Sequence, residues 1–130
     1  MMKRILAIIL LYSSFSHGAD VCRNVTASDQ VDSCLKSKKD SADKYLNEQY
    51  SMLLSKVNSE YINDESLKLD FVKNIKKSQR DWIKFRDSNC KLYSFQIDNK
   101  SSAYETTINE CVAKMSETRG KELAELAANI

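Results

Sequence analysis

The stretch from Gln79 to Cys90 constrains the fold most strongly, because its aromatic, charged and cysteine residues fit one face of a helix. At about 3.6 residues per turn, positions spaced by 3, 4, 3, 4 and 4 follow a single stripe. The stripe consists of Val72, Ile75, Gln79, Trp82, Arg86 and Cys90. A plain core helix would carry leucines in place of Gln79 and Arg86, and a buried polar group costs free energy unless it is hydrogen-bonded. These two residues therefore either bond inside the fold or face a partner.

The rest of the chain is also predicted to be helical. Beyond residue 19 there is no proline and a single glycine, Gly120, which is typical of an all-helical domain. Apolar residues at helical spacing predict three helices, from about residue 28 to about 58, from 64–66 to about 95, and from about 103 onward. With 130 residues the chain is long enough for one small domain. We therefore expect an all-α, three-helix antiparallel bundle over residues 20–130.

Two local features bear on the first helix. Thr26-Ala27-Ser28-Asp29 is a candidate helix start with a hydroxyl cap. The segment 36–41 is polar enough to permit a break in this helix.

The lysines of segment 36–41, and the basic residues from Lys73 to Lys84 in the second helix, are interpreted as lying on helix faces that contact solvent.

Residues 1–19 resemble a secretory signal peptide. Lys3 and Arg4 form a basic start, residues 5–12 an apolar core, and residues 16–19 a small-residue exit. The apolar run is too short to span a bilayer, and no second one follows. Cys22 lacks the small preceding residue that a lipoprotein signal needs, so we expect a periplasmic or secreted chain without a lipid anchor.

Removal of this segment limits the chemistry of the mature chain. It takes away His17, the single histidine, and lowers the basic residues from 20 to 18, against 18 acidic ones. Without histidine, Ser-His and Cys-His nucleophiles and the commonest zinc sites are excluded. A neutral chain has no overall field that attracts nucleic acid. Carboxylates that could be paired, such as Asp81 with Asp87 or Glu110, occur on most exposed helices, so they do not indicate a catalytic acid–base pair. We therefore expect a protein that is not an enzyme and binds no cofactor.

All four cysteines lie beyond residue 19, where an oxidising compartment favours disulfides. Three pairings are possible. Cys90 and Cys111 are each about ten residues from a turn centred between Lys100 and Ser101, and equidistant residues of an antiparallel helical hairpin face each other. We therefore prefer Cys90 with Cys111, a bridge contributing about 3 kcal/mol. Cys22 would then pair with Cys34.

A second arginine, Arg119, falls on the apolar stripe of the third helix, so both inward arginines require acceptors. The first helix offers Asp43. We expect a buried polar network of Asp43, Asn47, Gln79, Arg86 and Arg119. A network that fixes helix register is favoured over a ligand-facing pocket. Asp87 is expected to accept a bond from a neighbouring helix.

The connections offer candidate contact surfaces. Tyr61 and Ile62 lie in a short acidic connection, which either presents a protein-binding tip or packs its tyrosine inward. Lys100 and Ser101 lie in the second connection.

Three motifs of this chain resemble the LprI-like lysozyme inhibitor family of bacterial envelope proteins. They are Asp43-x-x-Leu46-Asn47-x-x-Tyr50, then Gln79-x-x-Trp82-Ile83-x-Phe85-Arg86-Asp87-x-x-Cys90, and Cys111-x-x-x-Met115-x-x-x-Arg119-x-x-x-Leu123. The cysteine pair flanking Thr26 also belongs to the pattern. The resemblance implies an exported helical domain in which Leu46, Tyr50, Trp82, Asp87 and Leu123 are family positions. The chain departs from the family in lacking a glycine-containing turn between its last two helices.

The resemblance implies a non-catalytic protein that binds and blocks a wall-degrading lysozyme. The lysozyme cleft holds two carboxylates, which donors such as Lys100 and Ser101 would reach. Two alternatives stay open: a periplasmic immunity protein that neutralises an antibacterial effector, and a structural envelope protein without inhibitory activity. No sequence feature indicates an oligomeric state.

Overall fold

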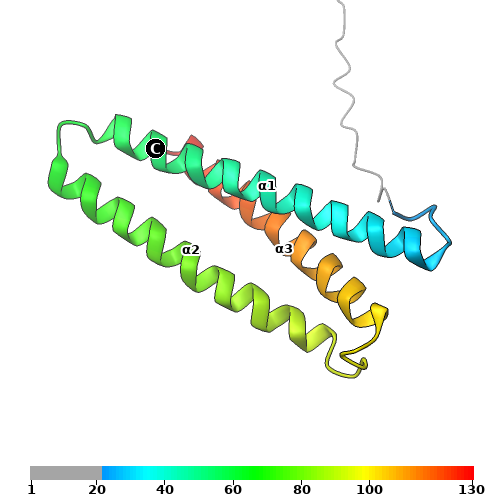
Figure 1. Cartoon of the computed structure of the whole chain (residues 1–130). Helices are drawn as coiled ribbons and strands as arrows, with labels where there is room; N and C mark the ends of the chain where they lie inside the picture. The colour runs from blue at the N-terminus through cyan, green and yellow to red at the C-terminus, as the bar shows by residue number, and fades with distance from the viewer. Residues whose placement is uncertain (1–21) are drawn as a thin grey trace, which may run out of the picture.

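Three long helices make up the fold in the computed structural model, which describes residues 22–130 (Figure 1). They are α1 (Ser28–Glu60), α2 (Glu65–Tyr93) and α3 (Ser102–Ala128), and the described residues contain no strand. Short connections make successive helices antiparallel, which confirms the predicted bundle. Helix α1 continues through the polar segment 36–41 without a break. The predicted signal peptide, residues 1–19, lies outside the described residues.

Side chains cap the free backbone N–H groups at the start of α2 and α3, but not at the start of α1. Asp64 accepts a hydrogen bond from the Leu67 amide at the start of α2, and Ser101 Oγ accepts one from the Tyr104 amide at the start of α3. The hydroxyl cap predicted for α1 is wrong. Ala27 occupies the cap position and makes no side-chain cap bond.

The apolar core lies where the three helices meet. Its buried members are Leu46, Leu53, Val57, Ile75 and Leu123. Full burial of each such side chain contributes roughly 1.5–3 kcal/mol. Tyr50 and Trp82 pack partly buried against this cluster. Asp87, which was also expected to be a family position, does not pack in this core and lies exposed on α2.

Helices α1 and α3 approach each other closely because α3 presents small residues to α1. Ala113, Ser116 and Gly120 are buried along α3. A Cβ atom added at Gly120 would lie 2.5 Å from Cε1 of Tyr45, well inside van der Waals contact. Glycine is therefore required here for space, since its backbone has ordinary helical dihedrals.

Two disulfides tie the chain, with the connectivity predicted from the sequence. Cys22 bonds Cys34 across a Cα–Cα distance of 5.7 Å, which holds the N-terminal arm on α1. Cys90 bonds Cys111 across 5.5 Å, which joins the end of α2 to α3. Within residues 22–130, no helix combines the length and apolar character needed to cross a membrane.

We predict that Gly120→Leu lowers the free energy of unfolding by about 3 kcal/mol, because the new side chain overpacks the α1–α3 contact. Urea unfolding of the purified protein measures the change. Adding Tyr45→Ala to the variant should recover part of the loss, since it removes the ring that the new side chain strikes. Equal stability of Gly120→Leu and the parent protein would show that the helices do not need this close approach.

Candidate functional site

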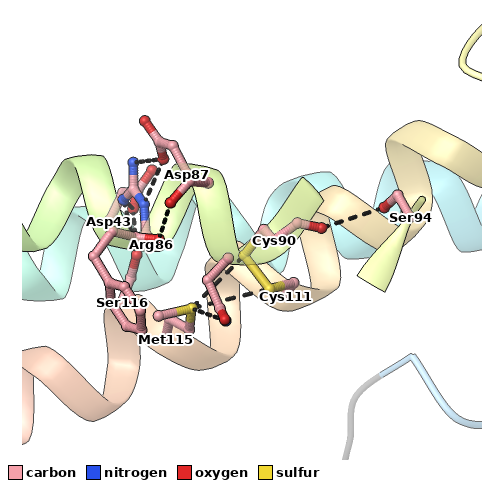
Figure 2. The surroundings of a disulfide bond; sticks show 11 residues. Asp43, Arg86, Asp87, Cys90, Ser94, Cys111, Met115 and Ser116 are labelled. Atoms are coloured by element: carbon pink, nitrogen blue, oxygen red, sulfur yellow. Dashed lines mark hydrogen bonds and ion pairs between the residues drawn. A yellow bond between two sulfur atoms is a disulfide. The ribbon is translucent and has the colours of Figure 1, made fainter. Parts of the chain in front are cut away.

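A cross-helix network centres on the guanidinium group of Arg86. Its Nη1 donates to Asp43 Oδ1 on α1 at 3.1 Å and to Ser116 Oγ on α3 at 3.2 Å (Figure 2). Ser116 in turn donates to Asp43 Oδ1 at 2.7 Å, and Arg86 Nε donates to Asp87 at 2.9 Å. Only 14% of the Arg86 side chain is exposed. One side chain from each of the three helices therefore contributes to this network around the partly buried charge of Arg86.

Arg119 forms a second network between α2 and α3. Its Nε donates to Gln79 Oε1 at 3.2 Å and its Nη2 to Ser78 Oγ at 3.1 Å. Its Nη1 pairs with Glu122 at 3.1 Å along the same helix. Gln79 is buried, so the bond from Arg119 satisfies an amide oxygen that water does not reach freely.

Trp82 lies beside both arginines. The guanidinium carbons of Arg86 and Arg119 lie 5.4 and 5.9 Å from the centre of its ring. Each distance suits a cation–π attraction of about 0.5–2 kcal/mol. The tryptophan thus joins the two networks through its ring.

Two residues differ from expectation in the structure, the network member Asn47 and the acceptor Asp87. Asn47 lies exposed, because it follows the buried Leu46 and successive helix positions turn by about 100°. Among residues 22–130, Arg86 bonds to Asp43, Asp87 and Ser116, and Asn47 is not one of its partners. Asp87 accepts from Arg86 of its own helix, so the expected bond from a neighbouring helix is wrong.

Sequence reasoning missed Ser116, which is fully buried and completes the Arg86 network. The sequence does contain a pattern that indicates this role for Ser116. Ser116 lies one turn before Gly120 on a face of α3 that carries small residues, and a hydroxyl on such a face can reach a neighbouring helix. The stripe assigned to the third helix runs through Met115 and Arg119, so Ser116 falls beside it.

A groove of about 460 Å³ runs between α2 and α3 next to these networks. Its α2 wall is lined by Trp82, Phe85, Asn89 and Tyr93, and its α3 wall by Thr107, Glu110, Cys111, Lys114, Met115, Thr118, Arg119 and Glu122. Asn89 donates to the Met115 sulfur at 3.4 Å across it, and the Cys90–Cys111 bridge lies at the same level (Figure 2). The groove is within the size range of ligand and side-chain pockets.

Exposed apolar side chains continue from the groove to the end of α2. Leu92, Tyr93 and Phe95 are 71%, 70% and 84% exposed. Asp98 holds the following turn, since its side chain accepts from the Lys100 amide at 3.0 Å and its carbonyl accepts from Ser101 Oγ at 2.6 Å. The exposed apolar residues at the end of α2 are therefore followed by a turn that hydrogen bonds hold in place. The Cys90–Cys111 disulfide ties this end of α2 to α3.

The predicted contact residues of the two connections have different roles. Tyr61 packs inward, with its ring 5.6 Å from that of Phe71, whereas Ile62 is 67% exposed. Ser101 caps α3, so its hydroxyl oxygen already accepts a hydrogen bond from the Tyr104 amide. Lys100 keeps an exposed side chain.

The carboxylates named in the sequence analysis have different surroundings. Asp81 pairs with Lys77 at 2.6 Å and Asp87 with Arg86 at 2.9 Å, whereas Glu110 lines the α3 wall of the groove. Within the described part of the chain, no three His, Cys, Asp or Glu residues gather in a way that would hold a metal ion.

Comparison with known proteins identifies relatives of this chain. The family model described as "Lysozyme inhibitor LprI" matches residues 22–123. No curated protein sequence matches significantly. The crystal structure of a DUF1311 family protein from Pseudomonas putida KT2440 is similar, with a TM-score of 0.72 and 24% identity over 82% of this chain and 100% of that one. That likeness supports the fold.

We predict that Asp43→Ala lowers the free energy of unfolding by about 2 kcal/mol, because Ser116 and Arg86 lose a shared acceptor in a poorly solvated site. Urea unfolding checks this value. Asp40→Ala is the matched control. Asp40 lies one turn earlier on α1 and pairs with exposed Lys36, so its loss should cost less than about 0.5 kcal/mol. Equal effects of the two variants would contradict a stabilising role for the network.

Proposed function

Since this chain belongs to the LprI lysozyme inhibitor family, we propose that it is an exported, non-catalytic protein that binds and blocks a lysozyme-type wall-degrading enzyme. The observation that carries the proposal is the family match over residues 22–123, which covers α1, α2 and most of α3. Two disulfides fit an oxidising compartment outside the cytoplasm.

We place the contact surface at the α2–α3 end of the bundle, defined as Phe85, Leu92, Tyr93, Phe95 and Lys100. Four of these side chains are large, apolar and exposed, which is unusual for a surface without a partner. Aromatic residues also dominate the binding free energy of many protein interfaces.

The rigidity of this end supports its use as an inhibitory surface. The Cys90–Cys111 bridge and the Asp98 hydrogen bonds fix the turn before any partner arrives. A preorganised surface loses less conformational entropy on binding, which improves affinity. The exposed ammonium group of Lys100 has the correct charge for the two carboxylates of a lysozyme cleft. The α1–α2 connection is less suitable, because Tyr61 is committed to packing on Phe71.

We predict that the purified mature protein, in molar excess, inhibits at least one of several lysozyme types in a wall-lysis assay. Tyr93→Ala with Phe95→Ala should raise the concentration needed for half-inhibition about 30-fold, the effect of losing interface anchor residues. Both side chains are exposed, so the circular dichroism melting curve should stay close to that of the parent protein.

Ile62→Ala is the matched control for the assay. Ile62 is an exposed apolar residue at the opposite end of α2, and its removal should leave inhibition unchanged. Full activity of every lysozyme in the presence of the parent protein would overturn the proposed function. Inhibition that survives Tyr93→Ala with Phe95→Ala but is lost with Ile62→Ala would move the contact surface to the α1–α2 connection.

A further inference from the structure

The outward face of α2 carries a line of positive charge. At helical spacing, Lys73, Lys77, Arg80, Lys84 and Lys91 follow each other at intervals of 4, 3, 4 and 7 residues, with Lys76 beside them. Exposed Asp87 lies in the last interval, where it pairs with Arg86. All six side chains are exposed. We call these six residues the basic face. It extends for about 27 Å, since a helix rises about 1.5 Å per residue.

This face lies away from the rest of the bundle. The inward residues Ile75, Gln79 and Cys90 are buried on the other side of α2, and Figure 1 shows α2 flanking the α1–α3 pair with one side free. Phe85, which lines the groove, occupies a third side of the helix. The basic face is therefore available while the groove is occupied.

The charge is concentrated on this one helix. Helix α2 has eight basic and four acidic residues, whereas the rest of residues 22–130 has ten basic and thirteen acidic residues. A nearly neutral protein thus has one positive side, which orients it toward a negative surface. Of the six basic side chains, Lys77 pairs with Asp81. The pKa of Asp81 is lowered by that hydrogen bond and further by the nearby charges of Lys84 and Arg80.

Two apolar residues lie among the basic ones. Leu69 precedes Lys73 by one turn and is 59% exposed, and Ile83 follows Arg80 by three positions and is 39% exposed. A phosphate-bearing polymer offers no apolar phase for them, whereas the headgroup region of a bilayer does. Lysines with long apolar stems also suit that region.

From the basic face and its embedded Leu69 and Ile83, we propose that α2 is a docking surface for an anionic lipid bilayer. The helix lies along the headgroups, its ammonium and guanidinium groups contact lipid phosphates, and its two apolar side chains enter the interface. This attachment is reversible, because it rests on charge and a small apolar area. It does not depend on lysozyme inhibition and leaves the α2–α3 end exposed.

Co-sedimentation of the purified mature protein with lipid vesicles tests the proposal. We expect binding to vesicles of phosphatidylcholine mixed with phosphatidylglycerol, and none to phosphatidylcholine alone. Raising the salt concentration from about 0.1 M to about 1 M should release most of the protein, since the screening length falls from about 10 Å to about 3 Å. Absence of binding to the anionic vesicles would overturn the proposal.

Charge variants locate the surface. Lys76→Gln, Arg80→Gln and Lys84→Gln together should weaken partitioning about 100-fold, the effect of three basic residues near an anionic surface. The matched control, Lys36→Gln, Lys44→Gln and Lys121→Gln, removes three exposed charges from α1 and α3 and should change partitioning less than about threefold. Equal losses in the two triple variants would show that net charge, and not the basic face, governs binding.

Apolar variants distinguish a bilayer from a polyanion. Leu69→Ser with Ile83→Ser keeps every charge, so it should weaken vesicle binding several-fold and leave retention on a heparin column unchanged. Heparin retention of the parent protein without vesicle binding would assign the basic face to an anionic polymer and refute the bilayer proposal.

Discussion

The charge of Arg86 inside the bundle is the constraint on which the helix arrangement depends. A guanidinium group has five N–H donors and no way to become neutral, so a site that is only 14% exposed must supply acceptors. Asp43 supplies one from α1 and Ser116 another from α3. Because these acceptors come from different helices, turning any helix by one position breaks the network. The apolar core fills the remaining space, but this charge selects the register.

The sequence predicts the architecture well because the inward stripe of α2 is unambiguous. Gln79 and Cys90 are buried at the predicted spacing, and the turn symmetry gave the Cys90–Cys111 pair. Polar partners were harder to predict. Helix α3 packs against two neighbours and therefore has two inward faces, one with Arg119 and one with Ser116. Periodicity identifies a stripe but does not say which neighbour it meets, so Ser116 was missed and Asn47 was included in error.

Helix α2 combines three roles because each of its faces meets a different environment. One face supplies Arg86 and Gln79 to the interior, a second contributes Phe85 to the wall of the groove, and the third carries the basic face. This division explains why its densest stretch identifies the family while most of that stretch serves the scaffold. The residues proposed to meet partners are those that the scaffold leaves exposed.

The two disulfides join cysteines that are consecutive in the chain, Cys22 with Cys34 and Cys90 with Cys111. Neither bridge encloses or crosses the other. A chain that enters an oxidising compartment from its N-terminus therefore presents each cysteine to its native partner before any competing cysteine arrives. In such a chain, oxidation in order of appearance would yield the native set directly, with a disulfide-type oxidant that accepts the two electrons of each thiol pair and without a disulfide isomerase.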